Sequence, residues 1–244
     1  MFTLALFGVV TGFVSGFFGI GGGTVLVPLL LLASYDMKSA VAISIMQMVF
    51  SSIYGSFLNS KKNRDILKDG IIIGFGGFCG GLLSGFIVPN IDEIYLKYTF
   101  LAVVIFSIYK VSLSKADIVE GVKEHNRVLL FIIGFFIGTI AMSIGVGGSV
   151  LLTPILAGYM YYNLKDASSL GLFFVIFSSI AGFISLSLND HMLYSDGFTV
   201  GLFSLFGVYF GIKIKNLTHI GSYKYLILGL YIIILVSLLN NIFF

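Results

Sequence analysis

Long apolar stretches separated by short polar segments recur along the whole 244-residue chain. An α-helix needs about 20 apolar residues to cross a lipid bilayer. Two of the stretches, residues 2–34 and 128–162, are longer than this and are broken by glycines. Continuous stretches near the spanning length cover residues 39–58, 70–88, 94–112, 167–188, 197–212 and 222–244. The pattern therefore predicts an all-α polytopic membrane protein with no soluble domain between its spans.

The composition supports a membrane environment. Hydrophobic residues make up 58% of the chain, charged residues make up 10%, and the mean hydropathy is +1.06. A chain with so little polar surface cannot coat a water-soluble globule. We expect a multi-pass protein of the cell membrane, with the lipid bilayer as its surroundings. Its net charge of +3 reflects basic loops beside a membrane, so no nucleic-acid partner is predicted.

Both broken stretches carry the same glycine motif. Residues 19–28 read GIGGGTVLVP and residues 145–154 read GVGGSVLLTP, which is a spacing of 126 residues. The same register aligns Gly8 with Gly134. With one residue inserted, it aligns Asp69 with Asp196. The sequence therefore predicts a duplication, with an N-terminal repeat over residues 1–127 and a C-terminal repeat over residues 128–244.

Loop charge indicates how the two repeats are oriented. The basic segment 61–64 (KKNR) corresponds to the acidic segment 189–196, which contains two aspartates. The next pair reverses the contrast, because the acidic segment 89–93 corresponds to a region with Lys213, Lys215 and Lys224. Lys and Arg collect in cytoplasmic loops, so equivalent loops are expected on opposite sides of the membrane. This predicts two inverted-topology repeats.

Inversion requires an odd number of crossings in each repeat. That number results if each broken stretch enters the membrane, turns at its glycines and returns, so that each repeat has a re-entrant hairpin plus three transmembrane helices. Both termini then lie outside, and of the 14 Lys and Arg residues only Lys38 and Lys97 lie outside. The alternative is that each broken stretch is a single interrupted span, which gives four ordinary crossings per repeat.

The glycine motif has the chemistry of an anion site. A helix that restarts after a break presents N–H groups without partners and carries partial positive charge at that end. Glycine lets a ligand approach the main chain, and a nearby hydroxyl can donate as well. The predicted binding residues of the two breaks are Gly19, Gly21, Gly22, Gly23, Thr24, Gly145, Gly147, Gly148 and Ser149. Pro28 and Pro154, inside the return limbs, each remove one backbone donor. If the motif has no ligand, its glycines serve close packing instead.

Polar residues on the spans after the breaks are candidates to line the same site. Two hydroxyl pairs occupy matching positions, Ser51 and Ser52 in the first repeat and Ser178 and Ser179 in the second. Serine in a membrane helix also bonds to its own backbone, which is the alternative role for these residues. Gln47 is the most polar residue of its span, and its counterpart in the second repeat is Phe174.

The spans lack the ionisable residues that a proton relay, a metal site or a catalytic site would need. None has Asp, Glu or His deep inside, so no proton relay is evident. The three histidines lie in predicted loops without metal-ligand spacing, and no metal, cofactor or catalytic residue is predicted. Lysines near the span ends are expected to reach the membrane surface with their ammonium groups. These are Lys97, Lys110, Lys213 and Lys224.

The duplicated motif resembles that of the sulfite exporter TauE/SafE family of membrane permeases. The resemblance rests on Gly16, on the first motif from Gly19 to Pro28 and on its echo from Gly145 to Pro154, and it covers essentially the whole chain. The second copy has Met142 and Ser149 at the positions of Gly16 and Gly23. The resemblance implies a permease for small sulfur-containing anions such as sulfite, thiosulfate, sulfoacetate and other sulfonates.

The leading functional hypothesis is therefore a secondary transporter, not an enzyme, that binds a small anion at the midplane between the two breaks. A passive anion channel could be built from the same residues. An intramembrane hydrolase is suggested by Ser149, but no span offers it a general base. The sequence leaves open the exact substrate, the coupling ion and whether the protein forms a homo-oligomer.

The inverted topology makes a prediction about labelling. A single cysteine placed within residues 61–68 and another placed within residues 189–196 should react with a membrane-impermeant maleimide from opposite sides of the membrane. The control is the chain with its native Cys79 replaced by serine, which should not react. Labelling of both loops from one side would refute the inversion.

Overall fold

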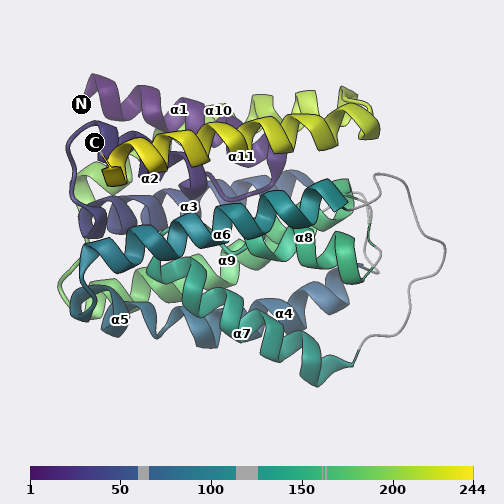
Figure 1. Cartoon of the computed structure of the whole chain (residues 1–244), viewed down its shortest axis with the longest axis horizontal. Helices are drawn as coiled ribbons and strands as arrows, with labels where there is room; N and C mark the ends of the chain where they lie inside the picture. The colour runs from purple at the N-terminus through teal and green to yellow at the C-terminus, as the bar shows by residue number, and fades with distance from the viewer. Residues whose placement is uncertain (60–65, 114–125, 161, 163, 244) are drawn as a thin grey trace.

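The structure is a computed structural model that describes residues 1–59, 66–113, 126–160, 162 and 164–243. Within these ranges the chain forms helices and no strand, which confirms the predicted all-α membrane fold (Figure 1). In chain order the helices are α1 (Phe2–Phe18), α2 (Gly23–Leu32), α3 (Met37–Asn59), α4 (Ile66–Gly81), α5 (Ser84–Asn90), α6 (Glu93–Leu113), α7 (Arg127–Ser143), α8 (Ser149–Tyr159), α9 (Leu164–Leu188), α10 (Tyr194–Leu217) and α11 (Ile220–Phe243).

Five helices of the described part are long and apolar enough to cross a membrane: α3, α6, α9, α10 and α11. Helices α4 and α5 together form a sixth candidate, bent by 40° at their junction. The four shorter apolar helices α1, α2, α7 and α8 occupy the two glycine-broken stretches. The breaks therefore occur where the sequence predicts them.

The first helix of each half packs in parallel against a helix of the other half. Contacts between α1 and α10 advance together along both helices, from Gly8 against Val200 to Gly16 against Val208. The contacts between α7 and α4 advance in the same way. The start of α1 is therefore level with the start of α10, and the start of α7 is level with the start of α4.

Each broken stretch folds back on itself. The Tyr35 hydroxyl, just after α2, donates to Asp196 Oδ2 near the start of α10 at 3.1 Å. The Tyr162 hydroxyl, just after α8, donates to Asp69 Oδ2 near the start of α4 at 3.0 Å. The chain thus leaves each broken stretch at the end of the molecule where it entered, which is the geometry of a helical hairpin.

The equivalent helices α3 and α9 run in opposite directions. Gly55 of α3 lies against Leu172 of α9, whereas Gly182 further along α9 lies against Ile45 near the start of α3. This antiparallel relation supports the inverted-repeat prediction, and Figure 1 shows both chain termini at the same end of the molecule. The basic segment 61–64, used in the orientation argument, lies outside the described residues.

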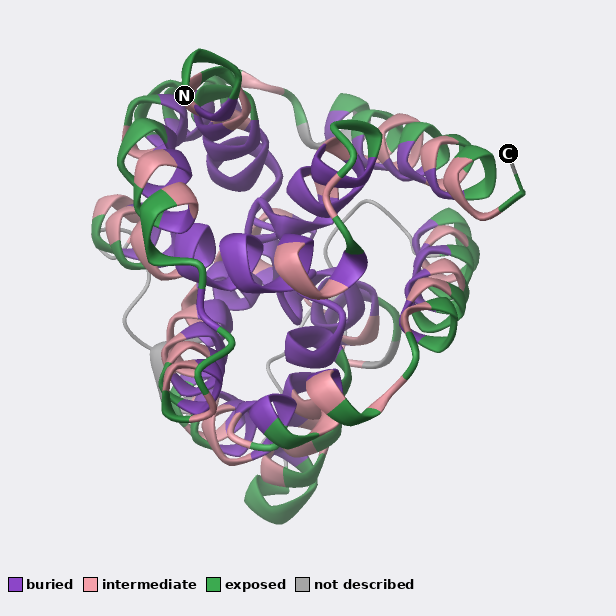
Figure 2. Ribbon diagram, turned by 90° about the vertical axis from the view of Figure 1, so that its left-hand side faces the viewer, coloured by how far each residue is buried: buried purple, intermediate pink, exposed green. Residues whose placement is uncertain are grey.

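Glycines allow close contacts between helices, as between α1 and α10 and between α4 and α7. Figure 2 shows that the buried residues gather along the middle of the molecule, with exposed residues around it. Large apolar side chains such as Phe57, Phe136 and Phe206 lie on the exposed surface. The interior contains many serine and threonine hydroxyls. This distribution suits a protein surrounded by lipid, in which small residues let helices pack closely.

The α1–α10 contact predicts a large effect of a single methyl group. A Cβ on Gly12 would overlap the carbonyl group of Ser204, because the two backbones touch there. We expect Gly12→Ala to lower the free energy of unfolding by about 1–3 kcal/mol, the usual cost of overpacking. Gly229→Ala in α11 is the matched control, since nothing lies within 4 Å of a Cβ at that position. Equal thermal stability of the two purified variants would contradict this packing.

Candidate functional site

The two breaks have the same backbone conformation at their first positions. Gly19 and Gly21 have φ angles of 68° and 80°, and their counterparts Gly145 and Gly147 have φ angles of 67° and 71°. Residues with a side chain rarely adopt such angles, whereas glycine adopts them at little cost. The repeated glycines are therefore required for the chain to turn. The copies differ at Gly22, which also has a positive φ of 67°.

Both breaks present backbone donors without acceptors. Because α2 and α8 begin here, the N–H groups of their first residues have no carbonyl one turn earlier. At the breaks, the N–H groups that donate to no acceptor among the described residues are those of Ile20, Gly21, Gly22 and Thr24 in the first break and those of Gly147, Gly148 and Ser149 in the second. Together with the helix dipoles, these donors favour negative charge at each break.

The two breaks touch each other. Thr24 Oγ1 donates to the carbonyl of Val146 at 3.0 Å, and Ser44 Oγ donates to the carbonyl of Gly145 at 2.7 Å. A Cβ on Gly23 would overlap the same Gly145 carbonyl. The structure thus brings the two motifs together. The Thr24 proton is already used to hold the second break, so its hydroxyl group is structural in this state.

Gln47 is the most informative polar residue near the first break. Its side chain is fully buried, and neither its amide nitrogen nor its amide oxygen has a hydrogen-bond partner in the described part of the chain. A Cβ on Gly22 would lie 2.7 Å from both of these atoms. A buried polar group without a partner costs about 1–3 kcal/mol. An amide kept under these conditions beside unpaired N–H groups is suited to a bound ligand.

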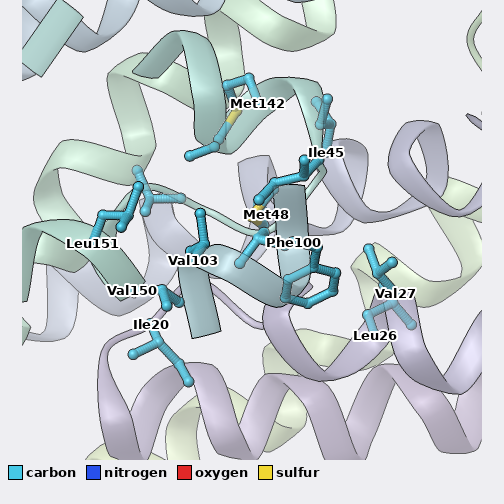
Figure 3. Packing of buried hydrophobic residues seen from close by; sticks show 14 of the residues in the cluster. Ile20, Leu26, Val27, Ile45, Met48, Phe100, Val103, Met142, Val150 and Leu151 are labelled. Carbon is cyan, nitrogen blue, oxygen red and sulfur yellow. The ribbon is translucent and has the colours of Figure 1, made fainter. Parts of the chain in front are cut away.

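The second break is covered by an apolar group instead. The ring of Phe174, the counterpart of Gln47, lies so close to Gly148 that a Cβ there would overlap it. Figure 3 shows Ile20, Met48 and Val150 among the buried apolar side chains of the core. The Met48 sulfur lies close to glycines of both breaks. The first break is therefore the polar one, and apolar side chains fill the space between the breaks.

The two departures in the second glycine motif are compensated across the packing contact. Ser149 replaces glycine, and it packs against Gly171, whose counterpart in the first half is Ser44. Met142 likewise replaces Gly16 and packs near Gly81, whose counterpart is Val208. Each contact thus pairs one small residue with one larger residue. The residue of the first broken stretch is the small one, and the residue of the second broken stretch is the larger one. The Ser149 hydroxyl is buried without a partner.

The serine pairs lie inside the molecule but are turned toward their own helices. Ser51, Ser178 and Ser179 donate long hydrogen bonds of 3.4, 3.3 and 3.4 Å to carbonyls three or four residues earlier. Ser52 is buried and its hydroxyl has no partner among the described residues. Their role in binding stays a prediction, and Ser52 is the member of the four with an unused hydroxyl.

The two prolines lie within the return helices as predicted. Pro154 has no N–H, so it cannot donate to the carbonyl of Val150 one turn earlier. Ser107 Oγ of α6 donates to that carbonyl instead, at 3.0 Å. Pro28 occupies the matching position in α2. The prolines thus act on the backbone of the limbs rather than on a ligand.

The sequence predicts that the span beginning at residue 197 ends at residue 212 and that Lys215 lies in the loop after it, which the structure corrects. Helix α10 continues to Leu217, and Lys215 is only 3% exposed. Its ammonium group donates to Ser168 Oγ at 3.0 Å and to Ser169 Oγ at 3.1 Å. The spacing of the buried residues Ser204, Val208, Gly211 and Lys215 on α10 is helical and could have revealed it. The low hydropathy of the segment hid this continuation.

The two tyrosine–aspartate pairs described above each join a broken stretch to a helix of the other half. Burial, followed by the hydrogen bond to Asp196 and its charge, raises the pKa of the Tyr35 phenol. Burial and Asp69 raise the pKa of Tyr162 in the same way. Both phenols therefore remain protonated donors at neutral pH. The glycines of both breaks are buried between these two pairs.

No group of three His, Cys, Asp or Glu side chains lies close enough to hold a metal ion in the ranges that the structure describes. The polar groups at the first break are instead neutral, namely backbone N–H donors and the Gln47 amide, which has both a donor nitrogen and an acceptor oxygen. Such groups can hold an oxyanion without a metal, because each oxygen of the anion accepts several hydrogen bonds.

Comparison with known proteins gives a family for this architecture. The model of the family described as "Sulfite exporter TauE/SafE" matches residues 4–238. The probable membrane transporter protein MJ0441 of Methanocaldococcus jannaschii is 46% identical over 69 residues, which are 28% of this chain and 26% of that protein.

Two relatives from Bacillus subtilis align over most of their length. The probable membrane transporter protein YunE is 22% identical over 217 residues, covering 78% of this chain and 79% of the relative. The probable membrane transporter protein YdhB is 25% identical over 218 residues, covering 84% of this chain and 86% of the relative.

The unpartnered amide of Gln47 makes a prediction about stability. In anion-free buffer, Gln47→Met should raise the free energy of unfolding by about 1–3 kcal/mol, because it removes a buried polar group without a partner. The same variant should lose the additional thermal stability that bound sulfite or sulfate gives to the wild-type protein.

The control for Gln47→Met is Ser56→Ala on the same helix, which also removes a buried, unpartnered hydroxyl group. This variant should keep the stabilisation by added anions, since Ser56 lies more than two turns from Gln47. A loss of stability on Gln47→Met in anion-free buffer would show that the amide has a structural role.

Proposed function

The chain belongs to the sulfite exporter TauE/SafE family of membrane transporters, and we propose that it is a secondary permease or exporter for a small anion. The family match and the named relatives support transport as the activity. We place the protein in the cell membrane as a multi-pass component. The anionic nature of the substrate is argued below from the residues at the first break.

The observation that carries the anion proposal is the unpaired Gln47 amide beside the N–H groups of Gly21, Gly22 and Thr24. All of these groups are buried, so water does not satisfy them in this state. A small oxyanion has several acceptor oxygens and can receive hydrogen bonds from all these donors at once. The start of α2 adds partial positive charge to the same point.

A sulfur oxyanion or an organosulfonate is the proposed substrate class. The family description names sulfite, and sulfite, thiosulfate and sulfoacetate all present several oxygens on one small group. The donors at the first break are a helix start and one amide, which recognise the oxygens rather than the rest of the molecule. Discrimination among these anions would then depend on the apolar side chains that surround the site, such as Met48 and Ile20.

Transport is proposed to occur by alternating access between two inverted repeats. The antiparallel helices α3 and α9, the two hairpins and the position of both termini at one end support this arrangement. Each tyrosine–aspartate pair joins the hairpin of one repeat to a helix of the other repeat. Opening one end of the molecule would break the pair at that end and leave the other intact.

The proposal predicts that bulk at the breaks blocks transport. Gly22→Leu and Gly148→Leu should abolish uptake of sulfite or thiosulfate into proteoliposomes, because each side chain would fill space beside the N–H donors. Gly158→Leu is the matched control, since Gly158 is exposed in α8 and nothing lies within 4 Å of a Cβ there. Wild-type uptake by both break variants, in correctly inserted protein, would refute the site.

The same proteoliposomes separate the proposed transporter from the other two functions. Saturable uptake that is accelerated by substrate on the opposite side indicates a transporter, whereas a passive channel gives flux without such exchange. Ser149→Ala should retain uptake, because Ser149 is not proposed to be a nucleophile. Loss of a hydrolytic activity in that variant would instead favour the hydrolase.

A further inference from the structure

A cavity of about 220 Å³ lies at the end of the molecule that carries both chain termini (Figure 1). Its wall combines the start of α3, the end of α5 and the chain that follows α9. The polar side chains that the cavity brings together include those of Lys38, Asp190 and His191. Pockets for drug-sized molecules have roughly 300–1,000 Å³, so this cavity suits a ligand of only a few non-hydrogen atoms.

The ammonium group of Lys38 has donors that the protein does not use. Lys38 Nζ donates to the carbonyl of Pro89 at 2.9 Å, which is its one hydrogen bond or ion pair with the described residues. Since an ammonium group has three N–H donors, two of them are available to a ligand. The apolar residues Val88, Leu186 and Met192 line the same cavity. A positive charge with two unused donors is therefore held at the edge of an apolar hollow.

The fold fixes the position of this ammonium group. In the alignment of the two repeats, Lys38 corresponds to Lys165, and each is the second residue of the helix that follows a hairpin. Lys165 Nζ donates to the carbonyls of Lys215 and Thr218 at the end of α10, as Lys38 does to a carbonyl at the end of α5. A cation at the negative end of a helix stabilises it, so the carbonyl contact is structural in both halves. The two unused donors of Lys38 face a cavity in addition.

A carboxylate in the same wall limits the charge of a ligand. Asp190 and Lys38, both within the described ranges, line the cavity without forming an ion pair. Lys38 attracts a negatively charged group, whereas Asp190 repels any further negative charge on the ligand. The cavity therefore favours an anion with a single charge over a dianion.

The cavity lies beside the tyrosine–aspartate pair of this end. Tyr35, which donates to Asp196, comes three residues before Lys38, and Asp196 closely follows the cavity residues 190–193. The neighbouring carboxylates of Asp36 and Glu93 already accept from backbone N–H groups at the start of α3. An anion held by Lys38 is thus next to the contact that would break when this end opens.

We propose that this cavity is a waiting site for the transported anion, in which Lys38 binds the sulfonate group of a monoanion with a short alkyl chain. The sulfonate oxygens accept from the two unused N–H groups of Lys38 and from a ring N–H of His191. The alkyl chain contacts Val88, Leu186 and Met192. Binding in the cavity does not depend on transport, whereas its role as a waiting site rests on the proposed function.

The test measures protection of a cysteine placed in the cavity. Ser39, which also lines it, is replaced by cysteine in the Cys79→Ser chain, and the purified protein is labelled with N-ethylmaleimide. Ethanesulfonate is added over a range of concentrations, with the ionic strength held constant by sodium sulfate. We expect ethanesulfonate to slow labelling saturably, and Lys38→Met to raise the half-protecting concentration about tenfold, as for a lost charge-assisted hydrogen bond. Lys97→Met is the matched control, since Lys97 lies near the start of α6 at the same end and does not line the cavity.

Three further variants separate binding from damage to the helix end. Lys38→Arg keeps the charge and a donor, so it should restore the half-protecting concentration to within about threefold of the wild-type value. Asp190→Asn should allow sulfate to protect as well, because the repulsion of a dianion is removed. Gln47→Met should leave protection unchanged, because the Gln47 site is separate. Protection that persists in Lys38→Met, or that is absent from the parent Ser39→Cys chain, would overturn the cavity site.

Uptake into proteoliposomes tests the role in transport. Lys38→Met should raise KM for ethanesulfonate about tenfold and keep Vmax, because it weakens capture and leaves the Gln47 site intact. An unchanged KM would overturn the waiting role. If the wild-type protein takes up no anion while ethanesulfonate still protects the cavity cysteine, the binding site stands and the proposed function fails.

Discussion

The structure depends on one constraint, which is that an interrupted helix inside a membrane must have its backbone polar groups covered by protein. Thr24 and Ser44 donate to carbonyls of the second break, whereas Ser168 and Tyr223 donate to the carbonyls that end α1. The carbonyls are satisfied in this way, but several N–H groups are not. These unpaired N–H donors, together with the Gln47 amide nitrogen, support the proposal of an anionic substrate.

The two halves of the chain have the same architecture but exchange small and large residues at their contacts. Where one half has Gly23 against Ser44, the other has Ser149 against Gly171. Two repeats can pack in this way as long as one of the two residues at each contact is small. The duplication can therefore keep its geometry while the two breaks diverge in chemistry.

Because of this divergence, the two breaks have different side chains beside them. Gln47 and the contact between Ser168 and Lys215 both adjoin the first break, while Phe174 covers the second. A transporter that binds one substrate at a time needs one site on its path, and the pseudo-symmetric position can then serve packing. The serine pairs match in sequence, but Ser52 has an unused hydroxyl whereas its counterpart Ser179 donates to its own helix.

The sequence by itself determined the all-helical membrane class, the glycine breaks and the family, because apolar length and duplicated glycines are local signals. It predicted one span over 70–88, where the structure has α4 and α5 bent by 40°. Its interpretation of Gln47 as a one-sided polar residue also depended only on alignment of the repeats. The tertiary structure decided which hydroxyls are already used, that Phe174 covers Gly148, and that Lys215 is buried beside Ser168. Those facts depend on contacts between helices far apart in the chain, and residue type and spacing do not encode such contacts.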